Sequence, residues 1–263
     1  MHNSNEKQIA GAILIVGVLI AGAILLKDAR PQVANAPSAN APSANAPSGN
    51  NIGAISQGRP VSSTDHITGN LNAKIVVVEY SDLECPFCKV FDATMKQVTQ
   101  NNNDVAWVYR HYPIAQLHSK AFKESEATEC AWDQGGNDAF WKYTDRLFAV
   151  TPSNNGLDAA ELPKIAEYVG LNVATFNTCL SSGKFTSKVQ ADFDDGVKAG
   201  ANGTPSSMII TKKDISTSTQ NEILTALNAP GAISFSSNNK KIMSMNGALP
   251  IDMVNKILAV LLK

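Results

Sequence analysis

The chain has 263 residues with 22 basic and 23 acidic side chains, and 44% of its residues are hydrophobic. A chain of this length can bury a sizeable core in one or two domains, and its near-neutral charge gives no support for nucleic-acid binding. Its four cysteines are too few for a small disulfide-held scaffold, so each one is considered individually.

The first predicted element is a membrane anchor. Residues 9–26 are uncharged and apolar, and as a helix these 18 residues extend about 27 Å, close to the roughly 30 Å hydrocarbon core of a bilayer. A cleaved signal peptide is the alternative, but its hydrophobic region is usually shorter, about 7–15 residues. Both A-x-A sites that follow would also leave proline as the first mature residue. We therefore expect an uncleaved transmembrane helix after a short cytoplasmic tail, residues 1–8.

A linker follows the anchor. Residues 34–48 repeat the unit ANAPS three times, and the stretch that follows is also small and polar. Such a composition cannot bury enough apolar surface to fold. We expect residues 27–59 to be a disordered tether that holds a domain, residues 60–263, outside the cytoplasm.

The domain is predicted to open with a βαβ unit. Residues 73–80 are rich in β-branched side chains and indicate a buried strand, and residues 105–109 indicate a second. Between them, helical spacing runs from Cys85 to about residue 100, with Pro86 at the first helical position, where proline is favoured. The expected inner face of this helix consists of Val90, Phe91, Met95 and Val98.

Helical patterns dominate the middle of the domain. The expected helices are 118–132 and 138–150 with a break at 134–137, then 158–169, 173–180 and a last one marked by Val189, Phe193 and Val197. Asp158 and Glu161 are spaced as a capping box for the third helix, and Asn172 is placed to cap the fourth. This region, about 114–199, is longer than a βαβ crossover needs, so we interpret it as an inserted helical subdomain.

The C-terminal part returns to the sheet. Gly203-Thr204-Pro205 precedes a short apolar strand at 207–210, a further strand is predicted at 240–245, and an amphipathic helix covers 251–262. Residues 212–238 are polar and irregular, with a short helix indicated at 221–227 and no role assigned.

Together, VVVEYSDLECPFC, the helical insertion and the GTP before a strand resemble the DsbA-like branch of the thioredoxin superfamily. The resemblance spans about 200 residues and implies an α/β thioredoxin-like fold with an inserted helical subdomain. It also implies that Cys85 is an exposed nucleophile and Cys88 the more buried resolving cysteine. The dipole at the helix start would lower the pKa of Cys85 well below the ordinary value of about 8.5.

The resemblance extends to residues around the dithiol. Pro205 matches the family's cis-proline, and Thr204 before it would hold an extended substrate through its backbone. Glu79 matches a buried acid whose pKa should be raised and which could relay the proton of Cys88. Pro86 and Phe87 would contact substrate. Phe87 is a departure, because histidine at this position helps to stabilise the thiolate in DsbA; we expect a less oxidising couple here, but one more oxidising than plain thioredoxin.

Other interpretations of these residues remain. Cys85 and Cys88 would be half of a zinc site if a second ligand pair existed, but no other cysteine pair or histidine pair has that spacing. Cys130 and Cys179 are either two buried free thiols or, outside the cytoplasm, a structural disulfide, which we favour. His111 and His118 are interpreted as structural or surface residues, and Glu84 as a neighbour that slightly raises the pKa of Cys85 or is simply solvated.

We therefore expect an extracytoplasmic, membrane-anchored, monomeric protein disulfide oxidoreductase that needs no metal or organic cofactor. Its partners would be exported proteins with reduced cysteines and a quinone-linked membrane reoxidase of the DsbB or VKOR-like kind. One alternative is a reductase or isomerase kept reduced by a membrane electron donor. Another is a surface-tethered binding module that retains only the fold.

Overall fold

The computed structural model describes residue 56 and residues 58–70, 72–229 and 231–263. The predicted anchor, residues 9–26, lies outside the described residues, as does nearly all of the predicted linker. Among the helices that are described, none combines the length and apolar character needed to cross a membrane.

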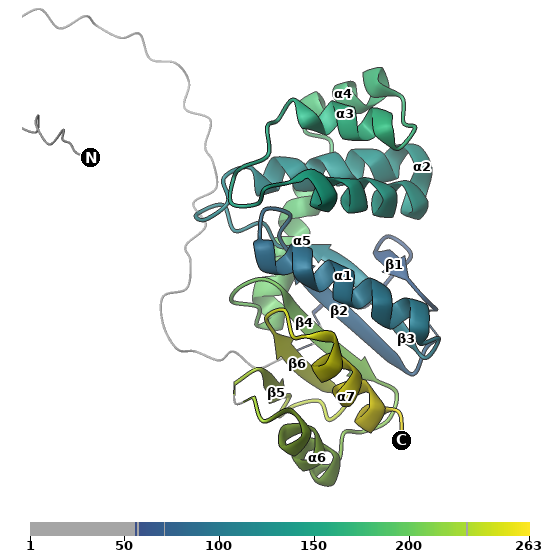
Figure 1. Cartoon of the computed structure of the whole chain (residues 1–263), viewed down its shortest axis with the longest axis vertical. Helices are drawn as coiled ribbons and strands as arrows, with labels where there is room; N and C mark the ends of the chain where they lie inside the picture. The colour runs from purple at the N-terminus through teal and green to yellow at the C-terminus, as the bar shows by residue number, and fades with distance from the viewer. Residues whose placement is uncertain (1–55, 57, 71, 230) are drawn as a thin grey trace, which may run out of the picture. The chain divides into compact units, whose positions relative to one another are not determined.

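A mixed six-stranded sheet forms the centre of the described part of the chain, in the order β1-β3-β2-β4-β6-β5 (Figure 1). Only β2 and β3 pair in parallel; the other neighbours are antiparallel. The strands are β1 (His66–Thr68), β2 (Ile75–Ser81), β3 (Val105–His111), β4 (Ser206–Thr211), β5 (Ile233–Phe235) and β6 (Ile242–Asn246).

The predicted βαβ unit is present. β2 leads into α1 (Pro86–Asn101), which returns the chain to β3, and Pro86 is the first helical residue as expected. Phe91, Met95 and Val98 lie in the core, but the side chain of Val90 is 59% exposed, so its assignment to the inner face was wrong. Val90 precedes Phe91 by one residue, a rotation of about 100° that carries it to the outer side of the helix.

The two faces of the sheet are covered by different helices. Alternation along β2 sends Ile75 and Val77 into one apolar cluster, which also takes in residues of α1 and of α7 (Ile251–Leu261). Val78 and Tyr80 enter a second cluster on the opposite face, against the end of α5 (Thr186–Ala199). Because both faces are covered, β2 is buried along nearly its whole length, as its continuous apolar sequence predicts.

The helical insertion contains α2 (Ala121–Val150), α3 (Glu161–Tyr168), α4 (Val173–Ser182) and α5. The expected break in the first long helix is confirmed, because Gly135 and Gly136 leave helical geometry and Gly136 has a φ of 63° that favours glycine. The Asn172 cap is also confirmed, since its side chain accepts a hydrogen bond from Thr175 N at 2.9 Å.

The predicted start of the third helix was wrong. The helix begins at Glu161, and the Asp158 carboxylate accepts a hydrogen bond from Ala160 N at 2.9 Å instead of capping residue 161. A short-range bond of this kind holds the backbone in a turn and delays the helix.

Two strands were not predicted, and the short helix indicated at 221–227 is longer in the structure. β1 and β5 have only three residues each, too few to show an alternating pattern. In the stretch 212–238, which had no assigned role, α6 (Thr217–Leu227) begins with Ser216 as its cap and packs on α7, and β5 pairs with β6 to extend the sheet.

Candidate functional site

The two cysteines that form no disulfide lie at the connection between β2 and α1. Residues 82–84 turn the chain, with Cys85 N donating to Asp82 O at 3.1 Å, and Cys85 becomes the cap residue of α1. Cys88 lies one turn into the helix and is fully buried. Both cysteines are free thiols.

Cys85 is 5% exposed, which corrects the expectation of an exposed residue. The cover comes from the loop before β4, where the Thr204–Pro205 peptide bond is cis. In its protonated form, the Cys85 thiol donates a hydrogen bond to the Thr204 carbonyl at 3.4 Å. This loop reaches the dithiol because β4 pairs antiparallel with β2, bringing Ser206 opposite Tyr80.

The surroundings of the two thiols shift their pKa values in opposite directions. A hydrogen bond from the Cys88 thiol lowers the pKa of Cys85 to about 6; burial opposes this shift, and the backbone N–H groups of Phe87 and Cys88 support it. Burial raises the pKa of Cys88 well above its ordinary value, and the nearby Cys85 and Glu79 charges add to that effect. At neutral pH, Cys85 is therefore mainly a thiolate and Cys88 a thiol, the combination needed for a reactive outer sulfur.

Glu79 is a buried carboxyl below the dithiol. One of its oxygens accepts a hydrogen bond from Trp107 Nε1 at 2.8 Å, and its other oxygen has no hydrogen-bond partner among the described residues. Burial raises the pKa of Glu79 to about 8, as the sequence led us to expect, so this side chain is mostly protonated at pH 7. When Glu79 ionises, its charge acts against the ionisation of both cysteines.

An apolar surface flanks the start of α1. Phe87 is 64% exposed, and Val90 is similarly exposed on the same helix. Pro86 is half-buried between Phe87 and the covered Cys85. Phe87 therefore offers an apolar contact at the dithiol but no charge and no hydrogen bond.

Asp82 and His118 are site residues that sequence reasoning missed. The Asp82 carboxylate accepts hydrogen bonds from Ile114 N at 2.8 Å and from His118 Nδ1 at 2.9 Å. Asp82 also contacts both cysteines through its backbone, because its N–H donates to Cys88 Sγ at 3.4 Å and its carbonyl accepts from Cys85 N. Asp82 is thus the residue that joins His118 to the dithiol.

The contacts of His118 favour its charged form. Burial alone would lower its pKa, but the hydrogen bond to Asp82 and the charges of Asp82 and Cys85 raise it. His118 lies 33 residues beyond Cys85 in the chain, and no local spacing marks it. The expectation that it is structural or on the surface did not include this interaction with Cys85.

Glu84 is fully buried, which corrects the interpretation of a solvated side chain. It faces Glu124 of α2; burial, together with the hydrogen bond that protonated Glu124 donates to the Glu84 carboxylate, raises the pKa of Glu124 to about 9. Glu124 is therefore mostly protonated at neutral pH. The Glu84 carboxylate and carbonyl also accept hydrogen bonds from the backbone of Asn155 and Asn154, which fixes the 153–155 loop beside the dithiol.

Cys130 and Cys179 form a disulfide that joins α2 to α4, the pairing favoured from the sequence. Both residues belong to the helical insertion, so this bond is separate from the free dithiol. It closes a loop with a sequence separation of 49 residues within the insertion.

The fold and this arrangement of cysteines, cis-proline and helix start define a DsbA-like thiol–disulfide oxidoreductase. A protein-family model described as Thioredoxin matches residues 61–229, and the chain belongs to that family.

Solved structures of similar fold agree with this class. DsbA2 of Pseudomonas aeruginosa matches with a TM-score of 0.54 and 25% identity, over 76% of this chain and 94% of that one. BdbD of Bacillus subtilis matches with a TM-score of 0.59 and 20% identity, over 80% of this chain and 99% of that one. At the lower identity, BdbD shows likeness of fold alone.

Curated relatives match over a shorter stretch. The Na(+)/H(+) antiporter NhaA 3 of Salinispora tropica is 32% identical over 141 residues, which is 54% of this chain and 21% of the antiporter. NhaA 1 of Mycolicibacterium gilvum is 30% identical over 159 residues, 59% of this chain and 25% of that protein. The chain thus spans about a fifth to a quarter of these relatives, and the likeness concerns one part of them.

Proposed function

We propose that the protein oxidises pairs of cysteines in exported proteins through a redox disulfide between Cys85 and Cys88. The observation that carries this proposal is the opposite ionisation of the two thiols beside the cis-Pro205 loop. A stabilised Cys85 thiolate favours the reduced form of the couple, which makes the oxidised form a better oxidant.

The proposed exchange proceeds in two steps. A substrate thiolate attacks Cys85 Sγ of the oxidised protein, so that the Cys85–Cys88 bond breaks, a mixed disulfide forms and Cys88 leaves as a thiolate. A second substrate thiolate then attacks the substrate sulfur of the mixed disulfide and releases Cys85 as a thiolate. Two electrons move from the substrate dithiol to the protein, and the substrate gains a disulfide.

Glu79 and His118 have separate roles in this proposal. Glu79, mostly protonated at pH 7, supplies a proton to the departing Cys88 thiolate, whose own pKa is high. His118, held by Asp82, offsets part of the negative charge that Asp82 brings to the dithiol. The Thr204 carbonyl accepts from the Cys85 thiol in the reduced protein; in the oxidised protein Cys85 carries no S–H, so this carbonyl would accept a backbone N–H of an extended substrate segment.

We further propose that residues 9–26 anchor the protein in the cell membrane with this domain on the extracytoplasmic side. The support is the apolar segment in the sequence and the disulfide between Cys130 and Cys179, a bond typical of oxidising compartments. A quinone-linked membrane protein of the DsbB or VKOR-like kind would reoxidise the dithiol, and a tethered domain would meet it readily.

The reduction potential of the Cys85–Cys88 couple tests the direction of transfer. We expect the full-length protein, equilibrated with glutathione buffers, to give a value between about −270 mV, as in thioredoxin, and about −120 mV, as in DsbA. We also expect the oxidised protein to introduce disulfides into a reduced, unfolded model substrate, whereas the Cys85→Ser variant does not. A value at or below that of thioredoxin would favour the reductase alternative.

A Cys88→Ala variant separates catalysis from binding alone. If exchange occurs at Cys85, this variant accumulates mixed disulfides with cell-envelope proteins, because the internal thiol that would release them is absent. If no mixed disulfide forms while the protein stays folded, the surface-tethered binding module becomes the better interpretation.

A further inference from the structure

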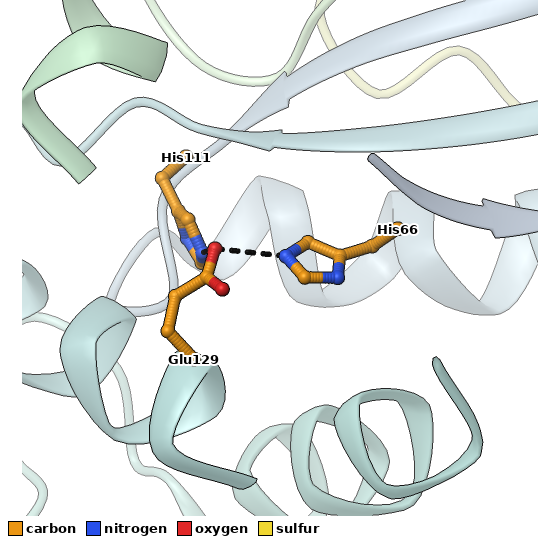
Figure 2. A group of neighbouring side chains, drawn as sticks. All are labelled: His66, His111 and Glu129. Atoms are coloured by element: carbon orange, nitrogen blue, oxygen red, sulfur yellow. Dashed lines mark hydrogen bonds and ion pairs between the residues drawn. The ribbon is translucent and has the colours of Figure 1, made fainter. Parts of the chain in front are cut away.

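Two histidines and a glutamate outside the dithiol site converge on one point (Figure 2). His66 comes from β1, His111 from the end of β3 and Glu129 from α2. Both Nε2 atoms lie close to the same carboxylate oxygen, Glu129 Oε1, at 2.8 Å for His66 and 3.2 Å for His111. One candidate ligand atom from each residue lies within 4.8 Å of the others, so a small rotation of the side chains brings all three to one ion.

The three side chains are shielded from solvent, with exposed fractions of 0%, 0% and 2%. The imidazole of His66 stacks face to face on Phe140, with ring centroids 3.5 Å apart, which fixes the direction of its Nε2. Imidazole binds a metal ion through a ring nitrogen in its neutral form.

Hydrogen bonding alone leaves this cluster incompletely paired. The Nδ1 atoms of both histidines have no hydrogen-bond partner among the described residues, and both are buried. Two imidazoles that each spend one nitrogen on the same carboxylate oxygen leave two polar atoms unpaired in the core, which costs free energy. The two Nδ1 atoms are not the proposed ligands, and among the described residues they stay unpaired whether or not the Nε2 atoms bind a cation.

We propose that His66 Nε2, His111 Nε2 and a Glu129 carboxylate oxygen bind a zinc-type first-row divalent cation that ties β1, β3 and α2 together. Two imidazoles and one carboxylate are a known ligand set for such ions, which leaves one position for water. Calcium and magnesium fit poorly, because they prefer oxygen ligands throughout. The two histidines lack a zinc-like local spacing, because they are 45 positions apart in the chain and meet through the pairing of β1 with β3.

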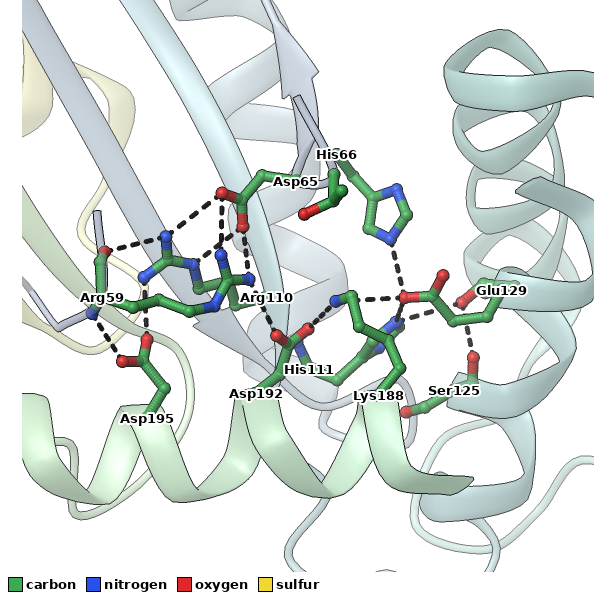
Figure 3. A network of polar contacts seen from close by, with 12 residues as sticks. Arg59, Asp65, His66, Arg110, His111, Ser125, Glu129, Lys188, Asp192 and Asp195 are labelled. Atoms are coloured by element: carbon green, nitrogen blue, oxygen red, sulfur yellow. Dashed lines mark hydrogen bonds and ion pairs between the residues drawn. The ribbon is translucent and has the colours of Figure 1, made fainter. Parts of the chain in front are cut away.

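The ammonium of Lys188 would compete with this cation for the Glu129 carboxylate. Its ammonium lies 3.4 Å from Glu129 Oε1 and 2.6 Å from Asp192 Oδ2 (Figure 3). The lysine side chain is 25% exposed, so it can turn toward solvent and Asp192 when a cation takes its place beside Glu129. Asp192 would remain paired, because Arg59 Nη2 also lies 3.0 Å from its carboxylate.

The test uses the full-length protein in detergent with Cys85 and Cys88 both changed to serine, so that no dithiol can bind metal. We expect Co²⁺ to give a saturable visible spectrum of a nitrogen- and oxygen-ligated site at one equivalent, and Zn²⁺ to displace it and raise the unfolding temperature. His66→Gln, His111→Gln and Glu129→Gln should each lower the affinity at least about tenfold. His118→Gln and His2→Gln are the matched controls and should bind as the parent does.

Lys188→Met gives an independent readout that does not rely on losing a ligand. Removing the competing ammonium should strengthen Co²⁺ binding by about tenfold, the size of a single close charge interaction at a partly buried site. Far-UV circular dichroism identifies any variant that fails to fold. The proposal is overturned if the parent shows no saturable binding, if binding survives the ligand variants, or if Lys188→Met has no effect on affinity.

Discussion

The thiol of Cys85 donates to the carbonyl of Thr204, a residue 119 positions further along the chain. The contact means that the reactive sulfur and the loop we expect to bind substrate are one structural unit. The loop also buries Cys85, but the pKa of the Cys85 thiol remains lowered, so the residue can still ionise. In the oxidised protein Cys85 has no S–H, which leaves the Thr204 carbonyl able to pair with a substrate backbone.

The first prediction concerns the ionisation of Cys85. Its thiolate absorbance in the reduced protein should titrate with a pKa of about 6. Cys88→Ala should raise that pKa, because it removes the hydrogen bond that contributes most to the shift. A value below about 4, near that of DsbA, would contradict this account.

Phe87 should set how oxidising the couple is. Phe87→His places an imidazolium beside Cys85, and we expect the thiolate pKa to fall by roughly one unit and the potential to rise by about 30 mV. Phe87→Leu, which keeps an apolar exposed side chain, is the control and should leave both values near those of the parent. If Phe87→His and Phe87→Leu changed the thiolate pKa and the potential equally, residue 87 would not set the redox properties of the couple.

His118 should stabilise the Cys85 thiolate through charge. His118→Gln leaves the Asp82 carboxylate unopposed, so the pKa of Cys85 should rise by roughly 0.5–1 unit, as expected for one partly screened charge. Adding Asp82→Asn in the double variant removes the opposing charge as well and should reverse most of the rise. A double variant with the same pKa as His118→Gln would show that the effect is structural.

Two buried carboxyls should make stability depend on pH. The pKa values of Glu79 and Glu124 are raised by burial to about 8 and about 9 in the folded protein. The folded state therefore holds their protons more tightly than the unfolded state, and the free energy of unfolding should fall as pH rises above about 4.5 toward 8–9. Glu79→Gln and Glu124→Gln should each flatten this slope in urea unfolding at a series of pH values, and an unchanged slope would count against the shifts.

The Cys130–Cys179 disulfide should contribute stability but not redox chemistry. Replacing both cysteines with serine should lower the free energy of unfolding by roughly 3–4 kcal/mol, the chain-entropy estimate for a loop of about 50 residues. The thiolate pKa of Cys85 should stay unchanged, because the bond lies within the helical insertion. A changed pKa would instead link the insertion to the dithiol.

Local signals in the sequence were enough to predict the centre of the fold. The β-branched run of β2, proline after Cys85 and the glycine pair in α2 each act on their own backbone, so their effect can be read without knowing the neighbours. The resemblance carried by CPFC, the insertion and GTP then brought Cys85, Cys88 and Pro205 together before the fold was known. The short strands β1 and β5 were missed because three residues carry no pattern.

The sequence by itself determined which residues could do redox chemistry and on which element they begin. Only the tertiary structure decided the burial of Cys85, the contact of His118 with Asp82 and the meeting of His66, His111 and Glu129. Those features depend on which strands pair and which helix covers them, and such contacts join residues far apart in the chain. Burial and charge at a site are sums over all neighbours, so no local pattern records them.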